Sequence, residues 1–106
     1  MLEMLAGKFP HVWTDVMKAS WLQRYIIIHS ILYYDLDTNV ITDRQYDRMS
    51  KDLVAIMSEM PEDQLKQTDY YYCMYDYDGN TGFDIRDRLT KQDHSYLTRI
   101  AMNIRR

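Results

Sequence analysis

The sequence predicts a mainly helical single domain with one small β-hairpin. The chain has 106 residues, of which 3 are Gly and 2 are Pro, and two long stretches place apolar residues at helical intervals. This length suits one hydrophobic core, since domains are typically built from roughly 100 to 150 residues. We therefore expect residues 1–106 to form one folding unit.

Charge and cysteine content narrow the classes of partner. The chain has 13 Lys and Arg against 16 Asp and Glu, which offers no general attraction for phosphate backbones, so direct nucleic-acid binding is not expected. The lone Cys73 cannot form an internal disulfide, and no Cys and His pair has zinc-site spacing, so we expect no metal. Without a secretion signal or an apolar span of ~20 residues, we expect a cytoplasmic protein that does not enter membranes.

Two helices are expected to pack as a hairpin between residues 13 and 60. In the first, residues 13–34, apolar residues recur with the period of an amphipathic helix. A T-x-x-Q capping box at residues 42–45 predicts that the second begins at Asp43, and a later proline ends it. His29 stands between apolar neighbours and is expected to be a packed core residue.

The segment 69–86 has a different composition and is expected to form the β-hairpin. Five tyrosines stand there before a Gly-Asn turn signal, and aromatic residues favour strands. We expect residues 70–77 to pair with residues 82–85. A C-terminal helix over residues 90–106 follows, because Thr90 resembles a helix cap and apolar residues form a narrow face behind it.

The tyrosine-rich segment is also a candidate protein-binding surface. It contains no basic residue between positions 69 and 84, and exposed tyrosines and acidic clusters favour basic protein partners. The alternative is that alternate tyrosines turn inward, as in a packed strand. The candidate contact residues are Tyr70, Tyr72, Tyr75, Asp76, Tyr77 and Asp78.

A group of aromatic and acidic residues joins the two predicted helices. Tyr33 and Tyr34 end the first helix. Asp43 and Asp47 lie four residues apart at the start of the second, hence on one face, with Tyr46 beside them. From spacing alone, the favoured interpretation is that Asp47 is simply solvated or pairs with Arg44, Arg48 or Lys51.

The series Y-Y-x-x-D-x-x-x-I-T-D-x-x-Y-D, residues 33–47, resembles a motif of domain Ia, the N-terminal helical domain of bacterial NAD-dependent DNA ligases. In that family the motif binds the nicotinamide mononucleotide half of NAD and presents it to a separate adenylation domain. The resemblance implies the domain Ia helical hairpin and NAD or nicotinamide mononucleotide as ligand. Carried over by position, it implies that the ligand residues are Tyr33, Tyr34, Asp43, Tyr46 and Asp47. An oxidised nicotinamide ring is a flat cation, which suits tyrosine rings and carboxylates.

One departure separates the chain from a complete ligase. Ligase chemistry uses a lysine in a K-x-D-G motif, and the similar string at residues 75–79 has tyrosine in that place. We therefore expect a small stand-alone ligase-related protein, of a kind familiar from phage and mobile-element genomes, that binds the nucleotide without catalysis. NAD hydrolysis is not expected, because it would need a pocket that excludes water around Asp43 or Asp47.

Two other functions stay open. The chain could be a protein-interaction module that uses the tyrosine-rich segment, for example a phage-encoded inhibitor of a host defence or replication protein. It could also supply the nicotinamide-binding part in trans to an adenylating enzyme. Both keep the domain Ia fold and differ in the surface that carries the function.

Overall fold

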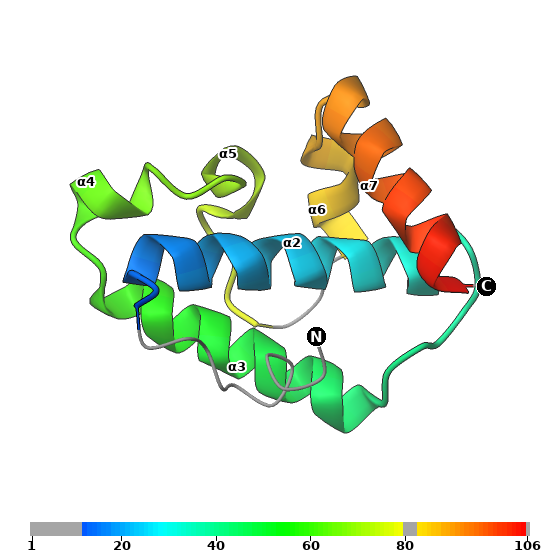
Figure 1. Ribbon diagram of the computed structural model, residues 1–106, viewed down its shortest axis with the longest axis horizontal. Helices are drawn as coiled ribbons and strands as arrows, with labels where there is room; N and C mark the ends of the chain where they lie inside the picture. The colour runs from blue at the N-terminus through cyan, green and yellow to red at the C-terminus, as the bar shows by residue number, and fades with distance from the viewer. Residues whose placement is uncertain (1–11, 80–82, 106) are drawn as a thin grey trace.

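The computed structural model describes residues 12–79 and 83–105. The helices in this part of the chain are α2 (Asp15–Tyr34), α3 (Asp43–Glu59), α4 (Glu62–Leu65), α5 (Tyr71–Met74), α6 (Phe83–Arg88) and α7 (Lys91–Arg105). The same residues contain no strand, and none of their helices is long and apolar enough to cross a membrane. Figure 1 shows α2 in the middle, with α3 on one side and α5, α6 and α7 on the other.

The two long N-terminal helices form the predicted antiparallel hairpin. Thr14 caps α2, and its side chain accepts a hydrogen bond from the Met17 N–H. The predicted capping box is present at α3, which begins at Asp43. The Thr42 hydroxyl accepts from the Gln45 N–H at 3.1 Å, and the Gln45 side chain accepts from the Thr42 N–H at 2.9 Å. The start of α3 expected from the capping box is therefore confirmed, while α2 begins at Asp15 rather than at residue 13.

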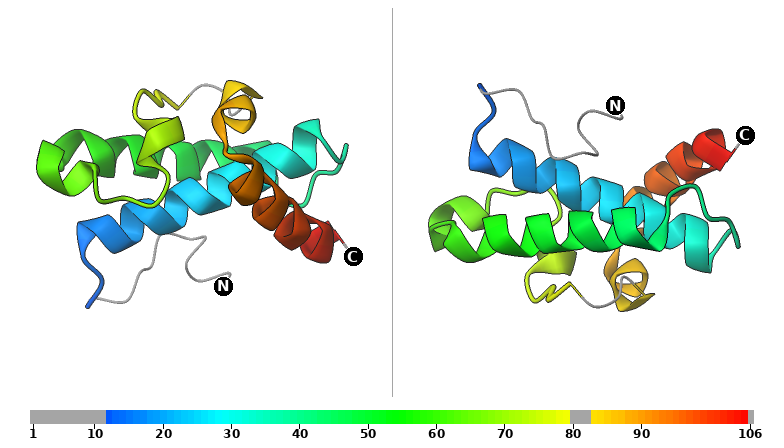
Figure 2. Two further views of the ribbon diagram at one scale, coloured as in Figure 1. Left: turned by 90° about the horizontal axis from the view of Figure 1, so that it is seen from above. Right: turned by 90° about the horizontal axis from the view of Figure 1, so that it is seen from below.

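Helix α2 is more deeply buried than an amphipathic helix. Every residue from Tyr25 to Leu32 is buried, although the sequence pattern predicted a stripe on one face. The reason is that α3 packs on one side of α2 while α6 and α7 pack on the other (Figure 2). A helix that is apolar all round is stable when its neighbours cover it all round.

The predicted β-hairpin over residues 69–86 is wrong. The two expected strands contain α5 and the start of α6 instead, and residues 80–82, where the turn was expected, lie outside the described part of the chain. The residues that turn toward the core are Tyr70, Cys73, Met74 and Tyr77. Their spacing is that of one helical face. Burial of this face outweighs the strand preference of tyrosine, which depends strongly on context.

The predicted C-terminal helix is confirmed as α7. The Thr90 hydroxyl accepts a hydrogen bond from the Asp93 N–H at 3.1 Å and so caps the helix. Leu97 and Ala101 are fully buried in the common core. Because α7 crosses α2 on the side opposite α3, it encloses the C-terminal half of the central helix.

A buried glutamine ties the segment before α5 to α2. Gln23 is 0% exposed. Its side-chain N–H donates to the Thr68 hydroxyl at 2.9 Å, and its carbonyl accepts from the Tyr70 N–H at 3.0 Å. One turn earlier, the Ser20 hydroxyl accepts from the Asp69 N–H at 3.0 Å. These bonds supply the partners that buried polar groups require.

We predict that Gln23→Leu lowers the free energy of unfolding by about 1–3 kcal/mol, because the buried Tyr70 N–H loses its partner. Urea denaturation followed by circular dichroism measures the change. Gln92→Leu, at an exposed position of α7, is the matched control and should alter stability by less than about 0.5 kcal/mol. Equal stability of the two variants would show that the Gln23 bonds do not stabilise the fold.

Candidate functional site

A pocket opens where α2 ends and α3 begins. Its walls are the last turns of α2, the connecting loop and the first turn of α3. The predicted ligand residues that line it are Tyr33, Tyr34, Asp43 and Tyr46. The pocket has a volume of about 230 Å³, below the roughly 300–1,000 Å³ of pockets for drug-sized ligands. It therefore suits one aromatic ring with part of a sugar rather than a whole dinucleotide.

Backbone hydrogen bonds shape the loop at the pocket's edge. Asp37 has a φ of 49°, in the left-handed region that Asp enters more readily than most residues. The Thr38 N–H donates to the Leu32 carbonyl at 2.8 Å, and the Thr38 hydroxyl donates to the Leu36 carbonyl at 2.9 Å. These bonds hold the loop against the end of α2.

Asp47 lies outside the pocket. Its side chain is 59% exposed on α3 and lies 3.0 Å from the Lys51 ammonium, one turn further along the helix. Such an exposed pair stabilises a helix by a few tenths of a kcal/mol. Asp43 and Tyr46 border both the pocket and a shallow depression that contains Asp47. A contact of Asp47 with the outer part of a ligand stays a prediction.

A chain of hydroxyl groups holds Tyr46 in the pocket wall. The Ser30 hydroxyl donates to the Ile26 carbonyl at 2.8 Å, so in its 3.1 Å contact with Tyr46 the tyrosine must be the donor. On the other side, the Tyr77 hydroxyl is hydrogen-bonded to Tyr46 and lies 2.7 Å from the Ser50 hydroxyl. Because each hydroxyl has one proton, all members of this hydroxyl chain donate in one direction, toward Ile26.

Tyr77 therefore supports the pocket from behind, although we expected it at a protein-binding surface. Burial and the neighbouring Tyr46 raise the pKa of Tyr77, so its hydroxyl stays protonated and able to donate. The sequence contains one signal of this inward position. Tyr77 falls at helical intervals after Tyr70 and Cys73, both of which are buried.

Helix α6 contacts the mouth of the pocket through Tyr34. The Tyr34 ring lies edge-on to Tyr33, with centroids 4.8 Å apart, and to Phe83 of α6 at 5.0 Å. The Arg86 guanidinium lies 5.1 Å from the centre of the Tyr34 ring and forms an ion pair with Asp35. Arg86 thus joins α6 to the end of α2 and positions one of the predicted ligand residues.

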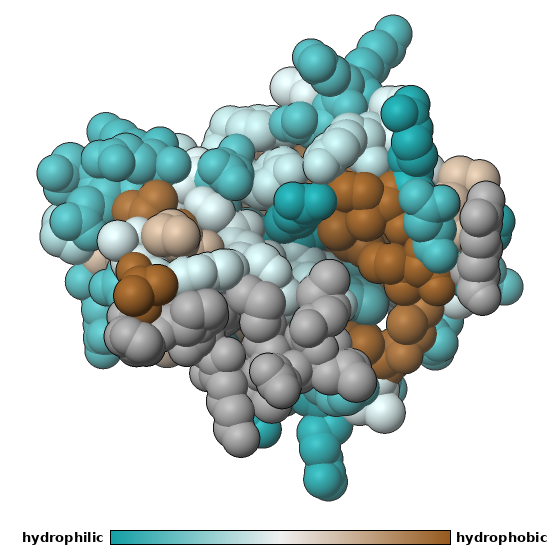
Figure 3. Space-filling view, in the orientation of Figure 1, coloured by the Kyte–Doolittle hydropathy of each residue, from teal (hydrophilic) through white to brown (hydrophobic). Residues whose placement is uncertain are grey.

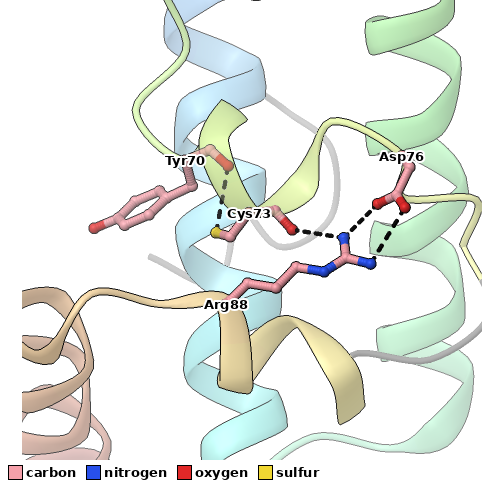
Figure 4. Close-up of polar contacts among 4 residues, drawn as sticks. All are labelled: Tyr70, Cys73, Asp76 and Arg88. Atoms are coloured by element: carbon pink, nitrogen blue, oxygen red, sulfur yellow. Dashed lines mark hydrogen bonds and ion pairs between the residues drawn. The ribbon is translucent and has the colours of Figure 1, made fainter.

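An arginine compensates the acidic charge of the tyrosine-rich segment. Two guanidinium nitrogens of Arg88 lie 2.5 and 3.2 Å from the two carboxylate oxygens of Asp76, and Arg88 also donates to the Cys73 carbonyl at 3.3 Å (Figure 4). The hydrogen bonds from Arg88 lower the pKa of Asp76. Residues 69–84 contain no base of their own, and Arg88 at the end of α6 supplies one.

The candidate protein-contact residues do not share one surface. Tyr70 is buried and Tyr77 is half-buried, whereas the exposed members are Tyr72, Tyr75, Asp76 and Asp78. The Tyr72 hydroxyl donates to the Asp93 carboxylate at 2.5 Å. Burial raises the pKa of the Cys73 thiol to about 12, so this residue is a buried apolar side chain rather than a reactive thiol. A protein-binding role for the exposed members stays a prediction.

His29 is buried, as expected, but it also lines the pocket. Its side chain is 5% exposed, and its ring lies against Tyr25 at a tilt of 34°, with centroids 4.7 Å apart. Burial lowers the pKa of His29 to about 4, so the imidazole is neutral at pH 7. Within the described ranges, no group of three His, Cys, Asp or Glu side chains is placed to hold a metal ion.

Comparison with known families identifies the segment that carries the pocket. Residues 14–69 match the model of a family described as DNA ligase-like, N-terminal NAD+-binding domain. This chain belongs to that family. The matched range contains α2, α3 and α4 and all residues of the pocket, and the ligase resemblance of residues 33–47 is confirmed. Helices α5, α6 and α7 follow the matched range.

Two curated relatives of this family member are DNA ligases. DNA ligase 1 of Nitratidesulfovibrio vulgaris (strain DP4) is 32% identical over 80 residues, which are 74% of this chain and 10% of that ligase. The DNA ligase of Methylococcus capsulatus (strain ATCC 33009 / NCIMB 11132 / Bath) is 45% identical over 47 residues, 44% of this chain and 7% of that ligase. The matched part of the chain thus spans a tenth or less of these relatives. No solved structure matches the chain.

We predict that Tyr77→Phe lowers the free energy of unfolding by about 0.5–1.5 kcal/mol, because the buried Ser50 hydroxyl loses its partner. Chemical denaturation measures the effect. Tyr75→Phe removes a hydroxyl from an exposed ring and should change stability by less than about 0.5 kcal/mol. Wild-type stability in Tyr77→Phe would contradict the hydroxyl chain.

Stability should also depend on pH through His29. Its pKa falls from 6.5 to about 4 on burial, so between these values the unfolded chain binds a proton that the folded chain does not. The contribution of neutral His29 to the free energy of unfolding is complete above pH 6.5 and is lost as the pH falls toward 4. Between pH 7 and pH 5 the loss should be about 2 kcal/mol.

The comparison variant for this measurement is His29→Gln, which does not titrate. Denaturation curves of both proteins at pH 7 and pH 5 give the difference that belongs to His29, because the other titrating groups are common to both. A loss of the same size in both proteins would contradict the prediction.

Proposed function

We propose that this domain binds nicotinamide mononucleotide, either free or as one half of NAD, in the pocket between α2 and α3 without catalysing a reaction on it. The observation that carries the proposal is the meeting of Tyr33, Tyr34, Asp43 and Tyr46 around one pocket. Membership of an NAD+-binding domain family supports the same ligand.

The chemistry of the pocket suits an oxidised nicotinamide ring. Tyr33 and Tyr34 are 53% and 40% exposed, which leaves ring surface available for an aromatic cation. The Asp43 carboxylate lies in the first turn of α3, where a negative charge interacts favourably with the helix dipole. It supplies negative charge for the ring and an acceptor for ribose hydroxyls.

The size of the pocket supports binding of one half of NAD. A volume of about 230 Å³ accommodates the ring and part of its ribose, so the phosphates and the adenosine would extend beyond the mouth. The shallow depression beside Asp43 and Asp47 is the adjoining surface. In this arrangement the domain holds the nicotinamide end and leaves the adenylyl phosphate open to a separate catalyst.

The sequence supports a binding role rather than adenylation. Its residues include no K-x-D-G string. Lys91 and Asp93 have the spacing of the first and third positions, but His94 takes the place of the glycine. The Asp93 carboxylate already accepts a hydrogen bond from Tyr72. We infer that the domain presents the nucleotide and does not itself take up AMP.

Calorimetric titration with nicotinamide mononucleotide and with NAD tests the proposal. We expect both to bind, and Tyr46→Ala to weaken binding of both at least tenfold, a loss of about 1.4 kcal/mol. The matched control is Tyr75→Ala, a tyrosine exposed near α5 and outside the pocket, which should bind as the wild type does.

Two results would refute the proposed function. The first is folded wild-type protein that releases no heat with either nucleotide at millimolar concentration. The second is an equal loss of affinity in Tyr46→Ala and Tyr75→Ala, because binding would then not depend on the pocket.

A further inference from the structure

A histidine that lines the pocket has a buried ring nitrogen without a hydrogen-bond partner. Among the described residues, the buried side-chain atoms without a partner are His29 Nε2 and Thr98 Oγ1. Buried polar atoms are nearly always paired, because an unpaired one has lost water without a replacement. A hydroxyl such as that of Thr98 is a small group with a rotating proton. An imidazole nitrogen bonds only in the plane of its ring and therefore requires a partner that lies in that direction.

The position of His29 indicates where that partner would lie. His29 lines the pocket together with Tyr33, one helical turn further along α2. Exposure falls from 53% at Tyr33 to 5% at His29, so the pocket wall runs from an open aromatic mouth to a buried imidazole. On the face shown in Figure 3, apolar side chains gather over this end of α2, beside the last turns of α7. A ligand ring that entered past the tyrosines would bring its inner edge toward His29.

The protonation state of His29 restricts the chemistry of the partner. Burial keeps the imidazole neutral at pH 7, so one ring nitrogen donates and the other accepts. A neutral imidazole does not repel a cationic pyridinium ring. A carboxamide has both an acceptor oxygen and a donor nitrogen, so it pairs with Nε2 in either tautomer. A carboxylate only accepts, so it pairs with Nε2 only in the tautomer that protonates this nitrogen, and in this pocket it would also meet the negative charge of Asp43.

We propose that His29 Nε2 hydrogen-bonds the carboxamide of the bound nicotinamide ring and makes the pocket select nicotinamide nucleotides over nicotinic acid nucleotides. This assignment rests on the proposed function and adds the residue that determines its specificity. The hydrogen bond that His29 lacks within the protein is supplied by the one group that distinguishes the two ligand classes.

Calorimetry of three proteins with two ligands tests this assignment. The ligands are nicotinamide mononucleotide and nicotinic acid mononucleotide, and the wild type should bind the first at least tenfold more tightly. His29→Leu should weaken binding of the first five- to thirtyfold and leave the second nearly unchanged, so the preference falls by the same factor. His29→Gln has an amide that pairs with a carboxamide and should retain most of the preference.

Thr98→Val is the matched control. It removes the other unpaired buried polar atom, which lies on α7 and does not line the pocket. Both affinities should stay at wild-type values in this variant. A change of preference as large as that of His29→Leu would assign the effect to altered packing and overturn the role of His29.

Nuclear magnetic resonance of the wild type gives a readout that needs no variant. The His29 Nε2 resonance should shift as nicotinamide mononucleotide saturates the protein, and the pH at which His29 titrates should change with it. Wild type that binds the nucleotide with an unmoved Nε2 resonance, or a His29→Leu protein with an unchanged preference, overturns this inference alone. Absence of binding by the wild type overturns the proposed function and the inference together.

Discussion

Helix α2 lies between α3 on one side and α6 and α7 on the other, and the position of each helix depends on that arrangement. The consecutive apolar residues Ile26–Ile28 point in different directions around the helix, so one neighbour cannot cover them. The segment that matches the ligase domain family supplies one cover, α3, and the residues after it supply the other. The C-terminal helices therefore complete the core of the segment that matches the family.

The sequence predicts the elements whose signals are local. The capping box before Asp43 and the cap at Thr90 are made by residues three apart, so both helix starts could be predicted from neighbouring side chains. The tyrosine-rich segment could not, because tyrosine fits either structure and the deciding factor is burial against distant residues. The Gln23 bond to the Tyr70 backbone is such a long-range contact, and nothing near Tyr70 in the sequence indicates it.

The candidate site also has features that the sequence predicts and features that it does not. The motif predicts which residues meet around the pocket, since Tyr33, Tyr34, Asp43 and Tyr46 adjoin one tight loop. It does not show that Asp47 turns to the outer face of α3, nor that His29 has a polar atom without a partner. Both depend on which side of a helix the neighbouring elements cover. The supporting role of Tyr77 depends on the fold returning a later segment to the back of Tyr46.

The one-way hydroxyl chain behind Tyr46 has a consequence for how the pocket meets its ligand. Each hydroxyl in this chain donates to one fixed acceptor, so the inner wall of the pocket has one conformation. Little conformational entropy would therefore be lost there on binding. The side chains that would become more ordered on binding are those of Tyr33 and Tyr34, whose exposed rings lie at the mouth of the pocket. Such a pocket is strict toward the ring that enters it and tolerant of whatever is attached to that ring outside.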